Sequence, residues 1–202
     1  MKILSVVPSF KILGGVANHY MGLHNYWSYD IEYAFYGKRK NIHAIFTLIP
    51  DIVIFIYKLL FHNIDVVVVN PSLRKYQLTR DGIYLLIARL FNKQVVTFIH
   101  GWDVNLAKQI QVKPKLFKFV YSKSKFIYVL CSDFKRVLDE LNMNIPIVLT
   151  TTKVDDKLLE NFDVSIRAGK IKQLLFLARL EKTKGIYELL DAFLMLQSKY
   201  PQ

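Results

Sequence analysis

The sequence predicts an α/β fold in which helices cover both faces of a doubly wound, parallel sheet. Short β-branched runs alternate with longer helical patterns over about the first 150 residues, which is typical of such a fold. The runs are continuously apolar, as in Asp65-Val-Val-Val-Val, and this indicates strands that are buried on both faces. The same alternation restarts after a polar stretch, which predicts the beginning of a second, similar domain.

The predicted elements follow one another in strand–helix order. Strands are expected at residues 3–7, 31–36, 66–69, 95–99, 126–130 and 147–150. Helices are expected at residues 16–26, 45–61, 78–91, 115–122 and 133–141. A further strand at 174–178, a charged loop and an amphipathic helix at 186–199 follow.

This order divides the chain into a first domain at 1–152, a connection at 153–172 and a second domain at 173–202. One strand and one helix cannot bury their own apolar faces. We therefore expect the second domain to be incomplete in this chain.

Composition narrows the class of protein. The chain has 202 residues, 28 Lys and Arg against 16 Asp and Glu, and a net charge of +12. A hydrophobic content of 52% excludes a disordered tail. The one cysteine, Cys131, excludes a disulfide framework and a cysteine-built zinc site, and we interpret it as an inert core thiol in a reducing compartment.

The longest apolar stretch, at 45–61, contains Pro50, Asp51 and Lys58 and falls short of the ~20 apolar residues of a spanning helix. We expect a cytoplasmic protein, either soluble or peripheral on the cytoplasmic face of the plasma membrane.

The positive charge gathers between Asp103 and Asp133, where no acidic residue occurs. Aromatic residues are interleaved with the lysines there, a pattern typical of a segment that lies on an anionic membrane. The alternative is a helix that packs on the core and turns its lysines to solvent. No nucleic-acid-binding motif accompanies the charge, so nucleic acid is not the expected partner. The membrane-facing candidates are Lys113, Lys115, Lys118, Lys123 and Lys125.

Gly14 and Gly15 stand between the first strand and the first helix. Glycines there allow close backbone approach, and a helix N-terminus offers free N–H groups to a phosphate. A purely structural loop explains the pair equally well. The dinucleotide fingerprint GxGxxG is absent, which disfavours a nicotinamide site.

His100 follows the strand at 95–99, and ligands of open α/β sheets bind outside the carboxyl ends of the strands. A histidine there can hydrogen-bond a substrate hydroxyl, and Gly101 leaves room for it. The alternative is a loop histidine beside Asp103, which would cap the next helix. The other histidines lack a metal-ligand spacing and are interpreted as surface or packing residues.

Arg179 and Lys184 lie in a charged loop that enters the helix at 186–199. Two cations at a helix N-terminus can clamp a diphosphate, although an exposed charged loop explains the spacing as well.

Taken in order, four segments resemble the family-four retaining glycosyltransferases, which have the GT-B fold of two Rossmann-like domains with the donor in the cleft between them. They are KILSVVPSFKILGGVANHY at 2–20, VVTFIHGWD at 95–103, FIYVLCSDFKRVL at 126–138 and LLFLARLEKTKGIYELLDAF at 174–193. Ser132 stands in the third segment, where the family often has a serine.

The resemblance implies transfer of a sugar from a nucleotide-diphosphate sugar to a lipid-linked or oligosaccharide acceptor, in the synthesis of cell-surface polysaccharide. It implies that Arg179 and Lys184 hold the leaving diphosphate, that His100 contacts the donor sugar as the catalytic residue, and that Gly14 and Gly15 approach the donor phosphates. It also implies retention of anomeric configuration, without a metal or other cofactor.

Two departures qualify this expectation. The family usually reads Ile-Pro-Asn-Gly-Val-Asp at the domain junction, whereas this chain retains only Val154 and Asp155. The family's two-glutamate motif for the donor would fall beyond Gln202, so we expect weak or no transfer by this chain alone. The competing hypotheses are a non-catalytic, truncated remnant that binds membrane or acceptor, and a nicotinamide-dependent oxidoreductase, which the missing fingerprint disfavours.

Overall fold

The structure is a computed structural model that describes residues 1–11, 14–37, 44–153, 160–161, 163, 175–178, 180 and 182–200. The chain forms two compact units, Met1–Glu160 and Asn161–Gln202.

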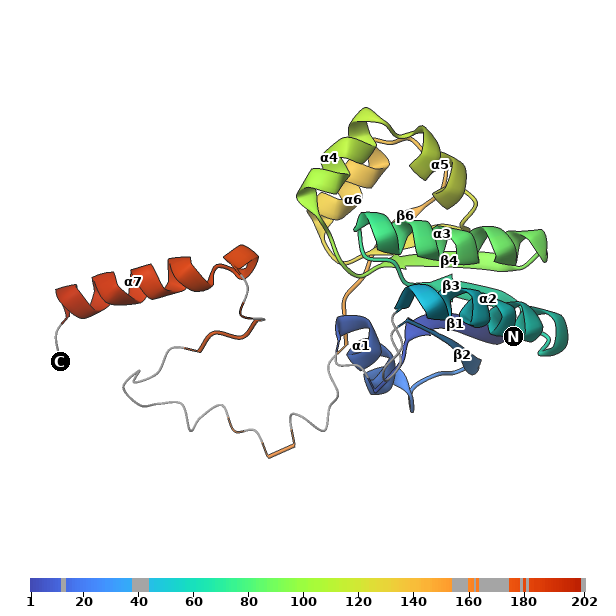
Figure 1. Ribbon diagram of the computed structural model, residues 1–202, viewed down its shortest axis with the longest axis horizontal. Coiled ribbons are helices and arrows are strands. Elements are labelled where there is room, and N and C mark those ends of the chain that lie inside the picture. Colours follow the sequence, from blue (N-terminus) through green and yellow to red (C-terminus); the bar gives the residue numbers. More distant parts are fainter. Residues whose placement is uncertain are drawn as a thin grey trace. The chain divides into compact units, whose positions relative to one another are not determined.

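The first unit is built on a parallel sheet of six strands with the order β2-β1-β3-β4-β5-β6 (Figure 1). Each neighbouring pair is parallel, which confirms the predicted α/β class and gives a Rossmann-like fold. The strands are β1 (Lys2–Pro8), β2 (Asp30–Tyr36), β3 (Val66–Val69), β4 (Gln94–Ile99), β5 (Phe126–Val129) and β6 (Ile147–Leu149).

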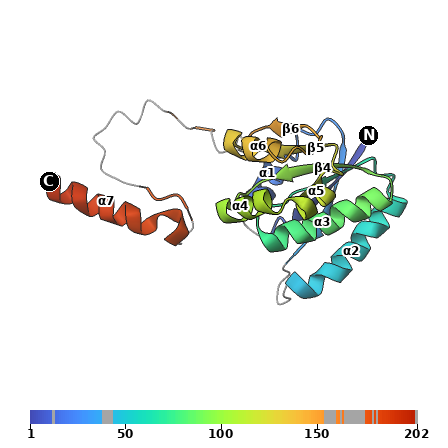
Figure 2. The same cartoon turned by 90° about the horizontal axis from the view of Figure 1, so that it is seen from above.

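Helices cover both faces of this sheet. They are α1 (Gly15–Leu23), α2 (Ala44–Phe61), α3 (Lys75–Leu90), α4 (Val104–Val112), α5 (Lys115–Tyr121) and α6 (Ser132–Asp139). Across the sheet, the connection from β1 to β2 runs toward one edge, and all later connections, from β2 to β6, run toward the opposite edge. Because parallel crossovers are right-handed, the reversal places α1 on one face and α2, α3 and α5 on the other (Figure 2).

The core lies between the sheet and this second group of helices. Val67 and Val69 of β3 are fully buried, as are Phe55 of α2 and Leu85 of α3. Burying one such side chain contributes about 1.5–3 kcal/mol. The apolar run at 66–69 therefore forms the central strand that its composition predicts.

The predicted elements of the first unit are present, with shifts of one to a few residues at their ends, and the structure adds α4. Asp103 begins α4 by accepting a hydrogen bond from Leu106 N at 3.0 Å. Only Ala107 of this helix is buried, and Leu106 and Ile110 pack partly buried against the core.

In the second unit, α7 (Ile186–Lys199) agrees with the predicted helix, and the 3-10 turn η3 (Lys182–Lys184) precedes it. The strand predicted at 174–178 is wrong for its described part, because residues 175–178 are not in a strand. Leu175 and Leu177 are 81% and 89% exposed, and a parallel strand needs a neighbour to pair with.

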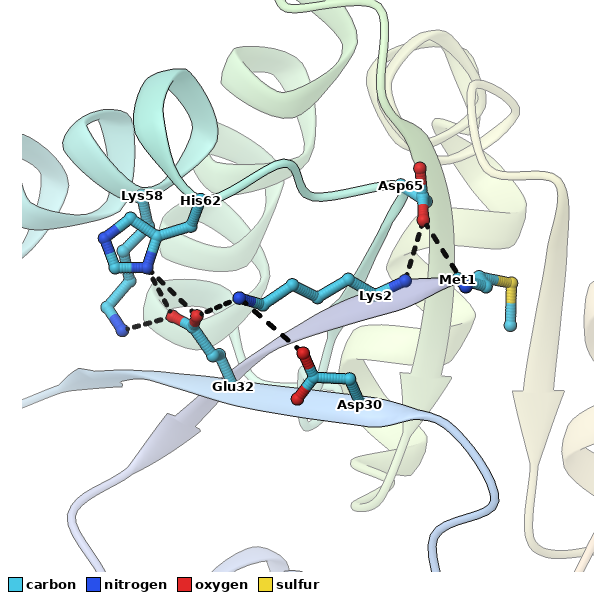
Figure 3. Close-up of polar contacts among 7 residues, drawn as sticks. All are labelled: Met1, Lys2, Asp30, Glu32, Lys58, His62 and Asp65. Atoms are coloured by element: carbon cyan, nitrogen blue, oxygen red, sulfur yellow. Dashed lines mark hydrogen bonds and ion pairs between the residues drawn. The ribbon is translucent and has the colours of Figure 1, made fainter.

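A polar cluster joins α2 to the amino ends of β1 and β2 (Figure 3). The Glu32 carboxylate is 2.6 Å from Lys2 Nζ, 2.9 Å from Lys58 Nζ and 2.9 Å from His62 Nδ1. Burial alone would raise the pKa of Glu32, but the hydrogen bonds from Lys2, Lys58 and His62 outweigh it and lower the pKa to about 2. The cluster stabilises the edge of the sheet where β2 has only one neighbouring strand.

None of the helices in the described part of the chain has the length and hydropathy needed to cross a bilayer.

Candidate functional site

The candidate site lies at the carboxyl ends of β3 and β4, where Asn70 and His100 follow the last residues of the two strands. The backbone beyond the strands stays paired, because His100 N donates to Pro71 O at 3.0 Å and Leu73 N donates to Gly101 O at 2.7 Å. This pairing holds the two loops in register and brings the two side chains together.

Gly101 is needed for that approach. A Cβ atom at this position would lie 2.7 Å from Ser72 Oγ and 2.8 Å from Ser72 Cβ, closer than real Cβ atoms come. The glycine next to the candidate histidine therefore makes room for the neighbouring loop.

Asn70 is the centre of a buried hydrogen-bond network. Its Nδ2 donates to Val6 O at 3.0 Å and to Ser5 Oγ at 3.1 Å. Its Oδ1 accepts from Tyr20 Oη at 3.0 Å and faces His100 Nε2 at the same distance. Because Nδ2 is used by two acceptors, the amide orientation is determined, and His100 Nε2 must be the donor to Oδ1.

That assignment sets the tautomer of His100. The proton lies on Nε2, so Nδ1 carries a lone pair that can accept a hydrogen bond. Burial, with a smaller effect from His19, lowers the pKa of His100 to about 3. The ring is neutral at physiological pH and offers hydrogen bonds rather than a positive charge or a strong base.

His19 lies beside His100, with ring centroids 5.3 Å apart. Its side chain is buried, and burial lowers its pKa. Its Nδ1 accepts from Lys153 N at 3.4 Å, while Lys153 Nζ lies 3.2 Å above the Tyr26 ring. His19 thus joins the site to the segment that leaves the sheet after β6.

Gly14 and Gly15 lie at the N-terminus of the helix that carries His19 and Tyr20. Nothing lies within 4 Å of a Cβ added to either glycine, so packing does not require a glycine at either position. The first N–H groups of a helix have no partner within it and are available to an anion. The structure thus brings the glycine pair and His100 to the same edge of the sheet, on the face covered by α1.

The remaining predicted site residues lie elsewhere or outside the described residues. Asp103 caps α4, so the structural interpretation of that residue is confirmed. Arg179 falls outside the described residues, and Lys184 is exposed in the second unit. The five candidate lysines lie at the end of α4, in α5 and in the turn before β5, which is not the His100 edge: Lys113, Lys115, Lys118, Lys123 and Lys125.

Cys131 is not a core thiol as expected. It is partly exposed and stands at the N-cap of α6, because β5 ends at Val129 and the chain has already left the sheet. Among the described residues, no group of three or more His, Cys, Asp or Glu side chains could hold a metal ion.

Sequence reasoning missed two members of the site, Asn70 and His19. Asn70 had the signal that singled out His100, namely a polar residue directly after a buried strand. His19 had none, because only the packing of α1 on β4 brings its ring against Phe98 and His100.

No protein-family model matches the chain, and no curated protein matches it.

Proposed function

We propose that the chain is the acceptor-side domain, with the beginning of the donor-binding domain, of a retaining glycosyltransferase that uses a nucleotide-diphosphate sugar. The acceptor in this proposal is a lipid-linked or saccharide acceptor of cell-surface polysaccharide synthesis. The observation that carries the proposal is the neutral His100, oriented by Asn70, at the edge of the sheet where α1 begins.

An uncharged imidazole suits a sugar ligand. A sugar hydroxyl can donate to the free Nδ1 of His100, whereas a charged group would cost more to desolvate at this half-buried position. With a pKa of about 3, His100 is a weak base. Its proposed role is therefore to bind and orient the donor sugar at the reacting centre.

In the proposed reaction the bond between the anomeric carbon and the diphosphate oxygen breaks. The acceptor oxygen forms its bond to the same face of that carbon, and its proton passes to the departing diphosphate. Negative charge grows on the leaving group, and the N-terminus of α1 at Gly14 and Gly15 favours that charge. Arg179 and Lys184 are proposed to supply the cations, as the sequence resemblance implies.

The second candidate is a non-catalytic protein that binds acceptor or membrane without turnover. The exposed lysines around α5 favour it, since they need no donor site to act. The two candidates differ in whether a nucleotide-sugar binds at His100.

Calorimetric titration of the full chain with uridine- and guanosine-diphosphate sugars tests the proposal. We expect at least one sugar nucleotide to bind, and His100→Ala to weaken it about tenfold or more without affecting the matching nucleoside diphosphate. His24→Ala, at the exposed C-cap of α1, is the matched control and should change neither affinity. Absence of binding to every sugar nucleotide, or an unchanged affinity in His100→Ala, would contradict the proposal.

Turnover is measured separately, as release of nucleoside diphosphate in the presence of lipid-linked and oligosaccharide acceptors. We expect weak or no transfer from the chain by itself, and rapid transfer would refute that expectation.

A further inference from the structure

Helix α2 has an exposed face without a single charged side chain. The two charged residues of α2 do not lie on this face, because Asp51 is buried and Lys58 forms an ion pair with Glu32. Over residues 46–61, every exposed side chain is apolar or aromatic. These residues are Phe46, Ile49, Pro50, Val53, Ile54, Tyr57, Leu60 and Phe61.

Such a face is unusual for a helix on the outside of a sheet. A surface helix normally turns charged residues outward and apolar residues toward the core. On α2 the inward side is apolar as well, because Phe55 and Leu59 lie in the core. A contiguous apolar surface of this kind marks a contact with another apolar phase or molecule.

The neighbouring helices α3 and α5 add positive charge and no exposed negative charge. They lie on the same face of the sheet as α2 (Figure 2). The acidic residues of the three helices are Asp51 and Asp81, and both are buried. The exposed cations of α3, α5 and the turns that flank them are Arg74, Lys75, Arg89, Lys113, Lys115, Lys123 and Lys125. Asp65, in the turn after α2, is an exposed acid and lies 3.9 Å from the N-terminal ammonium.

An open cleft of about 860 Å³ lies at the amino-terminal edge of the sheet, between the carboxyl ends of α3 and α5 and the starts of β4 and β5. Leu86, Leu90 and Phe119 form an apolar side. Arg89, Lys123 and Lys125 add three cations, and the described residues that line the cleft include no acid. Lys123 Nζ lies 4.9 Å from the centre of the Phe119 ring. Apolar walls next to cations suit an anionic amphiphile.

We propose that the outer surface of α2, α3 and α5 docks on an anionic lipid bilayer. In this arrangement the apolar face of α2 enters the boundary between headgroups and acyl chains, and the cleft at Arg89 and Lys123 receives a headgroup phosphate. Because parallel strands place the carboxyl and amino edges at opposite ends, the cleft lies away from His100. The proposal stands whether or not the chain transfers sugar.

Charge decides between a bilayer and a second copy of the chain. Two copies meeting through this surface would set cations against cations, and the three helices expose no acid to pair with them. An anionic bilayer supplies the negative charge and needs no matching shape.

The structure of α5 is compatible with both interpretations of the lysine segment. Helix α5 does pack on the core, through Phe117 and Tyr121. It nevertheless leaves Leu116 and Phe119 75% and 62% exposed among the lysines. Helix α5 thus packs against the core with one side and exposes apolar and basic side chains on the other.

Sedimentation of the full chain with vesicles tests the proposal. We expect binding to phosphatidylcholine vesicles that contain about one-third phosphatidylglycerol, and weaker binding to phosphatidylcholine alone. The double variant Ile49→Glu with Val53→Glu should lower the partition coefficient about tenfold or more, because two acidic groups would have to enter the bilayer boundary. Met21→Glu, an exposed apolar-to-acid change on α1 across the sheet, is the control and should leave binding unchanged.

The variant Arg89→Glu with Lys123→Glu should remove most of the preference for anionic over neutral vesicles. Circular dichroism and thermal melting of each variant check that the fold is kept, which the exposure of all four positions favours. Unchanged vesicle binding by either double variant would overturn the proposal. A dimer in light scattering that Ile49→Glu with Val53→Glu dissociates, without vesicle binding by the unaltered chain, would overturn it in favour of a second copy.

Discussion

Asn70 Oδ1 lies 3.0 Å from His100 Nε2, and this contact joins two residues that follow neighbouring strands of the sheet. Tyr20 of α1 donates a hydrogen bond to the same oxygen, so the Asn70 side chain links helix α1 to His100. The contact sets the tautomer of His100 and leaves Nδ1 as the group that can meet a ligand.

Replacing Asn70 by aspartate should change the titration of His100. A carboxylate beside Nε2–H would favour the imidazolium, so the pKa of His100 should rise from about 3 by one unit or more. Proton NMR of the imidazole C–H signals measures it. Asn70→Ala is the companion variant, since it removes the acceptor without adding charge. An unchanged titration in Asn70→Asp would mean that the contact with Nε2 does not persist in solution.

The neutral His100 should make the fold sensitive to acid. Burial lowers its pKa to about 3, whereas an unfolded chain takes up the proton near pH 6.5. The native state therefore binds fewer protons in this interval, and the stability present above pH 6.5 declines as the pH falls toward 3. The loss is on the order of 4 kcal/mol at the end of the interval. Urea titrations across that range should show a shallower decline for His100→Gln than for the unaltered chain.

Glu32 should add a second acid-sensitive step at lower pH. Its pKa of about 2 lies below the unfolded value of 4.5, because Lys2, Lys58 and His62 donate hydrogen bonds to the carboxylate despite its partial burial. Its contribution is complete above pH 4.5 and is lost as the pH falls toward 2.

The variant Glu32→Gln should be less stable than the unaltered chain at pH 6 and nearly equal to it at pH 2. Denaturant midpoints at the two pH values give the comparison. Asp139→Asn removes an exposed pair with Lys135 and should cost only ~0.3–0.5 kcal/mol at pH 6. If the difference in unfolding free energy between Glu32→Gln and the unaltered chain did not change with pH, the ion pairs of Glu32 would not contribute to stability in solution.

Gly101→Ala should destabilise the chain by about 1–3 kcal/mol, because the new methyl group would press on the side chain of Ser72. Adding Ser72→Gly should restore most of the loss, since the nearest remaining atom is Ser72 Cα at 3.6 Å. Gly14→Ala is the control, with open space around its Cβ and an extended backbone at φ −179°. Thermal melting of the four proteins measures these differences. If Gly101→Ala alone were as stable as the unaltered chain, the two loops would be able to separate.

The fold was predictable from the sequence because its signals are local. The run at 66–69 is apolar and β-branched at every position, which is typical of a strand inside a parallel sheet. His100 could be found in the same way, because the end of a parallel strand marks the edge where ligands bind. Helix α4 was not predicted, because it is short, buries only Ala107 and is capped by a single side chain.

The sequence alone determined the strands of the first unit, most of the helices and the place of His100 at the sheet edge, because periodicity and apolar content are properties of a few neighbouring residues. Only the tertiary structure showed that Asn70 and His19 meet His100, and that α2 leaves one apolar face uncovered. A hydrogen bond such as that from Lys153 N to His19 joins residues 134 positions apart, and no local pattern encodes it. Helix α2 is apolar at most positions, and its acid Asp51 faces inward, so how the helix packs on the sheet decides which side is exposed.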